Sequence, residues 1–237
     1  MVRPYLSVII PAWNEAKRLP LTLIDVDRHL SGKGFSYDIT VVVSPGTDNT
    51  LDILKRFETI IKNLKVIPLQ ENQGRGLAVK TGMRSAKGNW RLVMDADNSA
   101  TVMEFEKMQP YLDEYEILIG SRYISGGQME PAPPTLLRAM EAIGNWLIRT
   151  FIAKGIRDSG CGFKCFSATT ADKLFPAAQS NGWALDAEIL SLALKSGYKV
   201  KEIPIFWSYQ PGSNLTDRSH LKIFNDYLRV WWKKKRG

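Results

Sequence analysis

The sequence is poor in cysteine and histidine, and it has no long uninterrupted apolar run. Cys161 and Cys165 are its two cysteines, and His29 and His220 stand alone. A zinc site is therefore not expected, and the thiols are expected to be reduced. An apolar run of about 18 residues, the length that spans a bilayer, is also missing. The N-terminus lacks the basic-then-apolar pattern of a secretion signal. These absences predict a cytoplasmic protein without a membrane-spanning helix.

What the chain does have is a basic balance and enough apolar residues for a core. Its 237 residues include 32 Lys and Arg against 24 Asp and Glu, a net charge of +8, and 44% are hydrophobic. That length fits one α/β domain, with or without a short extension. The positive charge suits an anionic partner such as a nucleotide, a nucleic acid or an acidic membrane surface.

Short apolar, β-branched runs alternate with helical segments in the first half of the chain. This alternation predicts an α/β fold: a mainly parallel sheet with helices on both faces. Ligands of such sheets lie beyond the carboxyl ends of the strands, where the predicted loops converge. The predicted strands are 6–10, 38–43, 64–69, 90–95 and 116–120, and the loops that follow them are 11–15, 44–48, 72–76, 95–99 and 121–122.

The second half has a different character. A loop rich in Gly and Pro precedes a long amphipathic helix, whose wide apolar arc indicates either core packing or contact with lipid. The expected elements are the loop 126–134, the helix 135–153, a loop and strand over 158–166, a helix over 184–196 and a strand over 200–207.

Two carboxylates, Asp95 and Asp97, follow the fourth predicted strand. Residues i and i+2 of an extended chain point to the same side, so both acids could face one point beyond the strand. Oxygen ligands favour Mg²⁺ or Mn²⁺, and Mg²⁺ typically lies between one or two carboxylates and substrate phosphates. A polar turn with two solvated acids is the alternative, because Asp-x-Asp is a common pattern.

The C-terminal segment, 211–237, is expected to be an amphipathic basic helix following a domain that covers 1–210. Its apolar residues recur at helical spacing, and Trp231 and Trp232 come directly before four consecutive cations. Aromatic rings at headgroup depth with cations on anionic lipid are typical of an interfacial anchor. A solvated basic tail after a core helix is the alternative.

Six motifs in order resemble glycosyltransferase family 2, of the Rossmann-like GT-A fold, over about 5–210. More narrowly, they are similar to the dolichyl-phosphate glucosyltransferases and mannosyltransferases. Each motif alone is weak, but six in order are specific. They are SVIIPAWNE at 7–15, NQGRG at 72–76, DAD at 95–97, IGSRY at 119–123, GIRDSGCGFK at 155–164 and WALDAE at 183–188.

The resemblance implies inverting transfer of a hexose from a nucleotide-sugar, of the UDP-glucose or GDP-mannose type, to a polyprenyl (dolichyl) phosphate at the cytoplasmic membrane face. Mg²⁺ or Mn²⁺ is the implied cofactor, and a membrane-protein subunit stays open as a further partner. By matching position, the catalytic residues are Asp97, Asp186 and Arg122, and the metal ligands are Asp95 and Asp97. The donor site comprises Pro11, Ala12, Asn14, Glu15, Ser44, Gly74, Arg75, Asp95 and Ala96, and the acceptor phosphate meets Arg122, Arg138 and Lys164.

The chain departs from the family pattern at three places. The family's Asp-Asp-Gly-Ser motif after the second strand is replaced by Val43-Ser44-Pro45-Gly46, which leaves the choice of base open. Two residues after Asp97, where mannosyltransferases often carry Gln, this chain has Ser99, which is closer to the glucosyl relatives. Gly212-Ser213-Asn214 lacks the usual lysine, for which Arg218 or Lys222 could substitute.

Two other functions stay open. One is a family 2 transferase that acts on a soluble or glycan acceptor, although the Gln-x-x-Arg-Trp motif of processive synthases is absent. The other is a non-catalytic nucleotide-sugar-binding module, suggested by the missing Asp-Asp pair. A nucleic-acid role depends on net charge alone and is not expected.

Overall fold

A computed structural model describes residues 3–210 and Asp226 of the chain. The predicted helical tail therefore lies outside the described residues, apart from Asp226. The α-helices are α1 (Leu19–Ser31), α2 (Thr50–Ile60), α3 (Arg75–Ser85), α4 (Thr135–Leu147), α5 (Ala168–Ala177) and α6 (Leu185–Lys195), and the shorter helices are η1 (Val102–Lys107), η2 (Gln109–Tyr111) and the π-helical η3 (Ile148–Ile152).

Seven strands form the main sheet in the spatial order β3-β2-β1-β4-β7-β5-β8, and β6 pairs with β9 separately. The main sheet is parallel except at β7, which runs antiparallel to both of its neighbours. This confirms the predicted mainly parallel sheet. The strands are β1 (Leu6–Ala12), β2 (Tyr37–Val43), β3 (Leu64–Pro68), β4 (Trp90–Val93), β5 (Ile117–Ser121), β6 (Gln128–Met129), β7 (Lys164–Ser167), β8 (Val200–Pro204) and β9 (Phe206–Trp207).

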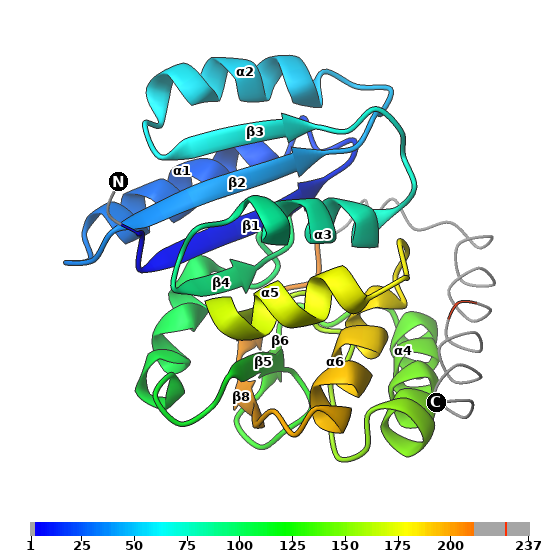
Figure 1. Cartoon of the computed structure of the whole chain (residues 1–237). Helices are drawn as coiled ribbons and strands as arrows, with labels where there is room; N and C mark the ends of the chain where they lie inside the picture. Colours follow the sequence, from blue (N-terminus) through cyan, green and yellow to red (C-terminus); the bar gives the residue numbers. More distant parts are fainter. Residues whose placement is uncertain (1–2, 211–225, 227–237) are drawn as a thin grey trace.

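Helices cover both faces of the sheet, with α3 and α5 in front of the strands and α1 behind them (Figure 1). Strand β1 shows why, because its successive side chains alternate between two apolar clusters. Val8 and Ile10 pack with residues of α1 and α2, whereas Ile9 packs with residues of α3, α5 and α6. The central strands are thus buried on both sides.

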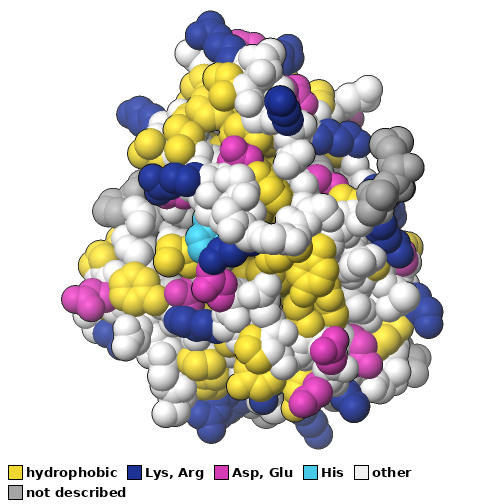
Figure 2. Space-filling model, turned by 90° about the vertical axis from the view of Figure 1, so that its left-hand side faces the viewer, with side chains coloured by type: hydrophobic (Ala, Val, Ile, Leu, Met, Phe, Trp, Pro, Cys, Tyr) yellow, Lys and Arg dark blue, Asp and Glu magenta, His cyan; other side chains and the backbone are white. Residues whose placement is uncertain are grey.

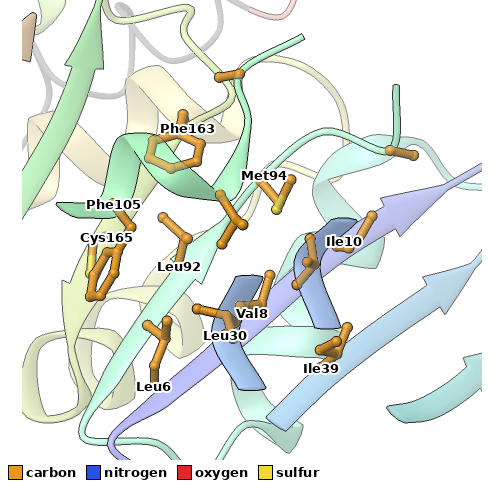
Figure 3. Close-up of a cluster of buried hydrophobic side chains, with 14 of the residues drawn as sticks. Leu6, Val8, Ile10, Leu30, Ile39, Leu92, Met94, Phe105, Phe163 and Cys165 are labelled. Atoms are coloured by element: carbon orange, nitrogen blue, oxygen red, sulfur yellow. The ribbon is translucent and has the colours of Figure 1, made fainter. Parts of the chain in front are cut away.

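The core behind the sheet fixes the strand that precedes the two acids. Figure 3 shows Leu92 of β4 beside Val8 of β1, with Leu30 of α1 packed across them. Met94 continues this buried cluster at the carboxyl end of β4. Chain direction at Asp95 is therefore set by well-packed neighbours immediately before it.

Several expected boundaries in the second half are wrong. The loop and strand predicted over 158–166 are found, with an irregular segment that leads into β7 at Lys164. The helix predicted over 135–153 changes to η3 after Leu147, and the strand predicted over 200–207 is divided at Ile205. Helix α5 was not predicted at all.

The opposite faces of the molecule differ in their role. Strands β1 to β4 in Figure 1 point to the right, so their carboxyl ends and the loops that follow lie on that side. Figure 2 shows the other side, where the strands begin, and there acidic and basic side chains are mixed among apolar ones. Within the described residues, no helix is both long enough and apolar enough to cross a bilayer.

Candidate active site

The carboxyl edge of the sheet brings together charged residues from four distant parts of the chain. Asp95 and Asp97 follow β4, Arg75 begins α3, Lys164 begins β7 and Asp186 lies in the first turn of α6. Lys164 reaches this edge because β7 is antiparallel, so its amino end lies beside the carboxyl ends of β4 and β5. Asp95, Arg75, Asp186 and Lys164 are joined in one network, and Asp97 lies beside it.

The two carboxylate oxygens of Asp97 differ in their contacts. Its Oδ1 accepts hydrogen bonds from the backbone N–H and the hydroxyl of Ser99, at 3.0 and 2.6 Å. Its Oδ2 accepts no hydrogen bond from the described residues and lies 3.8 Å from Nη1 of Arg18. Burial and the neighbouring charge of Asp95 raise the pKa of Asp97. A divalent cation would relieve this repulsion.

Asp95 is held from two directions. Arg75 donates from Nη2 and Nε to its Oδ1, at 2.9 and 3.3 Å. Gly162 packs against the same carboxylate so closely that a Cβ there would lie 2.0 Å from Oδ2. Glycine is therefore required at 162 to leave room for the Asp95 carboxylate.

Arg75 also contacts a second carboxylate, that of Asp186. Its Nη1 donates to Oδ2 of Asp186 at 3.0 Å, and its guanidinium faces the ring of Trp183 at 5.4 Å. Burial opposes the charge of Arg75, but the carboxylates of Asp95 and Asp186 outweigh it, and the pKa is raised. Arg75 is thus a permanent cation shared between the two acids.

Lys164 lies beneath Asp186. It is 2% exposed, donates to Asp186 Oδ1 at 2.8 Å and also donates to the backbone carbonyl of Cys161. Its charge is therefore already paired inside the protein. The predicted contact of Lys164 with an acceptor phosphate would require that pair to open.

Glu15 and Arg18 form a second pair beside Asp97. The Arg18 guanidinium contacts both oxygens of Glu15, at 2.7 and 2.5 Å. Burial raises the pKa of Glu15, and the bond from Arg18 opposes that rise. Sequence analysis did not single out Arg18, which lies three residues after Glu15 and directly before α1.

The loop that replaces the Asp-Asp-Gly-Ser motif packs tightly on the end of β1. Asn14, at φ 53°, has a side-chain oxygen that accepts from the backbone N–H of Thr47 at 2.8 Å. A Cβ at Gly46 would lie 2.1 Å from that oxygen. Ser44 is buried at the start of this loop, and Pro11 and Ala12 are buried at the end of β1.

Two loops close together form one wall of the site. Gly74, at φ 109°, and Gly76 lie against the backbone of Asn181 and Gly182, where a Cβ would be within 3 Å of a backbone atom. Leu77 donates its backbone N–H to the carbonyl of Asn181 at 3.0 Å. Asp226, from the C-terminal segment, has a carboxylate oxygen 2.8 Å from a Cβ placed on Gly182.

Arg122 is buried in a neutralised pocket. Its Nε and Nη2 donate to the two oxygens of Asp158, at 2.8 and 3.0 Å, and Asp158 is 0% exposed. Its guanidinium faces the rings of Tyr123 and Trp207 at 5.2 and 5.0 Å. Asp158, which sequence analysis missed as a partner, belongs to the same RDSG segment as the recognised motif.

Arg138, in contrast, lies exposed in the first half of α4. The carboxylate of Glu141, one turn later, contacts Arg122 at 3.4 Å. This contact joins α4 to the pocket of Arg122. Arg138 is therefore an exposed cation on the helix that borders the site.

The donor set suits a divalent cation completed by phosphate oxygens. Among the described residues, no three His, Cys, Asp or Glu side chains are grouped as a complete metal cage. Asp95 and Asp97 together offer two carboxylates, and Asp97 Oδ2 accepts no hydrogen bond from the part of the chain that the structure describes. One or two carboxylates plus substrate phosphates is the usual set for Mg²⁺.

A mainly parallel sheet with an Asp-x-Asp pair at its carboxyl edge is typical of the GT-A class of glycosyltransferases, and solved structures share this fold. Glucosyl-3-phosphoglycerate synthase of Mycobacterium tuberculosis matches with a TM-score of 0.70 at 14% identity, covering 97% of this chain and 81% of that one. The mannosyltransferase PcManGT of Pyrobaculum calidifontis, solved with GDP-Man and Mn²⁺, matches at 0.68 with 15% identity, covering 100% and 65%.

The chain belongs to glycosyl transferase family 2, whose family model matches residues 7–173. Dolichyl-phosphate beta-glucosyltransferase of Drosophila melanogaster is 33% identical over 243 residues, covering 95% of this chain and 74% of the relative. The protein of that name from Dictyostelium discoideum is 32% identical over 240 residues, covering 95% and 73%. The predicted family and the narrower resemblance are both confirmed.

Proposed function

We propose that this glycosyltransferase moves glucose from UDP-glucose to a polyprenyl phosphate, with inversion at the sugar carbon. The observation that carries the proposal is the network at the sheet edge, which joins an Asp-x-Asp pair to Asp186 through Arg75. The glucosyl relatives support the choice of sugar and acceptor. The uridine base is supported by a fold neighbour, the mycobacterial synthase solved with Mn²⁺ and UDP-glucose.

The proposed reaction is a single displacement. An oxygen of the acceptor phosphate attacks C1 of glucose, and the bond between C1 and the diphosphate oxygen breaks as UDP leaves with the electron pair. The phosphate monoester is already mostly ionised near neutrality, since its second pKa is about 6, so no base has to remove a proton. Asp186, at the acceptor side of the network, is then assigned to orient a sugar hydroxyl rather than to act as base.

Mg²⁺ or Mn²⁺ would be held by Asp97, with Asp95 beside it. When bound, the ion supplies positive charge for the leaving diphosphate. The chain adds two cations of its own near this position, Arg75 and Arg18. The guanidinium of Arg75 suits phosphate oxygens, because its planar fork can donate two parallel hydrogen bonds.

The acceptor side needs a surface that meets lipid, and α4 with η3 offers one. Leu136, Ile143 and Trp146 are 75, 60 and 51% exposed. The rings of Trp146 and Phe151 form an edge-to-face pair with their centroids 6.3 Å apart. Large exposed apolar side chains of this kind mark an interaction surface. Exposed cations accompany them at Arg138, Arg149, Lys154 and Arg157.

We therefore propose that the protein associates peripherally with an anionic membrane on its cytoplasmic face, through α4, η3 and the C-terminal segment 211–237. Arg138 then lies close to the headgroups and binds the acceptor phosphate, with Arg122 behind it. Apolar side chains inserted at headgroup depth and cations on anionic lipid would act together.

The test is a transfer assay with the full chain. UDP-glucose and GDP-mannose are each supplied with polyprenyl phosphate in anionic vesicles, with Mn²⁺, Mg²⁺ or a chelator. We expect a polyprenyl-phosphate hexose from UDP-glucose with a metal ion, and vesicle binding that Ile143→Glu combined with Trp146→Glu weakens. If the protein transferred the sugar to a soluble acceptor and did not bind vesicles, the acceptor would be that soluble molecule and not a polyprenyl phosphate. Metal-independent or absent binding of both nucleotides would indicate a non-catalytic module.

A further inference from the structure

The carboxylate of Asp186 is held by two different cations, one on each oxygen. Lys164 donates to Oδ1 at 2.8 Å, and Arg75 donates to Oδ2 at 3.0 Å. Asp186 is itself partly buried, with a side-chain exposure of 17%. Two charge-assisted hydrogen bonds to separate oxygens fix both the position and the plane of a carboxylate.

The two cations differ in how permanent their contact is. Arg75 begins α3 beside a glycine loop and divides its donors between Asp186 and Asp95. A nucleotide-sugar diphosphate beside Asp95 would compete for the same guanidinium. Lys164 lies in β7, where it is paired in register with Val93 and Ile119 on either side, and it is only 2% exposed.

We infer that Lys164 is a positioning residue of the transfer reaction, which holds Asp186 against the sugar when the donor diphosphate draws Arg75 away. This inference rests on the proposed function. It also gives Lys164 a different role from the acceptor-phosphate contact expected from the sequence, because its ammonium is already occupied by Asp186 and the carbonyl of Cys161.

The first test measures binding without any acceptor. The affinity of the protein for UDP-glucose is compared with its affinity for UDP by calorimetry, with Mn²⁺ present, and the ratio reports the contact with the sugar. We expect Lys164→Met to reduce this ratio about tenfold, the usual effect of losing a hydrogen bond to a charged group. Asp186→Asn should reduce it similarly, and the double variant should lose no more than either single one.

A matched control is available in Lys80→Met. Lys80 is also a buried lysine, 7% exposed, and it donates to the backbone carbonyl of Ala178 at 3.4 Å, away from Asp186. The ratio should be unchanged in this variant. Equal ratios in wild-type protein and Lys164→Met, multiplied losses in the double variant, or wild-type protein that binds UDP-glucose no tighter than UDP would each overturn the inference.

The second test separates positioning from phosphate binding. In the transfer assay, Lys164→Met should lower kcat about tenfold or more while KM for polyprenyl phosphate stays within about twofold. A raised KM with unchanged kcat would make Lys164 an acceptor-phosphate ligand and overturn the inference. If wild-type protein gives no transfer at all, the proposed acceptor is wrong, and the binding ratios alone decide the role of Lys164.

Discussion

The two halves of the molecule handle charge in different ways at the same sheet edge. In the donor half, residues 6–100, Asp97 keeps one oxygen without a hydrogen bond from the described residues, 3.8 Å from Arg18. In the acceptor half, residues 101–210, Arg122 and Lys164 are paired with Asp158 and Asp186 at 3.0 Å or less. In the proposed reaction this oxygen of the donor half would meet the metal ion, whereas the buried cations of the acceptor half are already neutralised.

The largest expected effect follows from removing the charge of Asp97. Asp97→Asn keeps an oxygen for the hydrogen bonds of Ser99 but removes the anion that would hold the metal, so we expect transfer to fall about a thousandfold. Transfer kinetics and Mn²⁺ binding measure this. Asp172→Asn, which alters the partner of Arg91 at 2.7 Å, is the control and should keep activity. Full activity of Asp97→Asn would show that the donor half needs no anion there.

A second prediction concerns stability in the acceptor half. Asp158→Asn leaves Arg122 buried without its carboxylate, and breaking a buried pair from one side costs about 3–5 kcal/mol. Chemical denaturation of the variant measures this loss. The exposed pair of Arg28 and Asp25, at 2.8 Å, is the comparison, and Asp25→Asn should change stability by less than about 1 kcal/mol. Similar losses in both variants would contradict a special role for burial.

A smaller effect is expected for the exposed cation of α4. Arg138→Ala should raise KM for polyprenyl phosphate about tenfold and leave the affinity for UDP-glucose unchanged, because one charged hydrogen bond at an exposed site is lost. Arg149→Ala is the matched control for general basic charge, because Arg149 is an exposed arginine of η3 on the same surface. An equal rise in KM for both variants would assign the effect to membrane attraction instead.

The smallest expected signal comes from the thiols. Burial raises the pKa of Cys161 to about 12, and Cys165 is buried too, so thiolate is scarce at pH 8. Native protein should therefore take up almost no alkylating reagent at that pH, and two equivalents should react after denaturation. Rapid native labelling of Cys161 would show that the acceptor half opens around Asp158 and Arg122.

The donor half could be predicted from the sequence because its local signals agree. Strands such as Leu6–Ala12 and Tyr37–Val43 are mostly apolar, as expected of parallel strands buried on both faces. Its loops end in recognisable Gly, Asn and Asp positions. In the acceptor half the signals conflict: α5 contains Pro176, β7 has four residues, and Ile205 interrupts the last predicted strand.

The sequence pointed to charged residues that the structure brings together, but it did not reveal how they pair. The motifs named Arg75, Lys164 and Asp186 as separate ligands of donor and acceptor. Their mutual contacts join positions 22 and 111 residues apart, which depend on the sheet order and on the reversed direction of β7. Burial at Lys164 and at Arg122 likewise follows from tertiary packing, which residue type alone does not reveal.

The reversed direction of β7 sets a limit on how this enzyme can vary. Sheet side chains alternate, so shifting β7 by one position would turn Lys164 to the opposite face and bring Cys165 to its place. A change in the number of residues between η3 and β7 would therefore displace Lys164 from Asp186 even if the side chains of that segment were kept. We therefore expect relatives to keep the length of this segment, because the position of the Lys164 ammonium group depends on it.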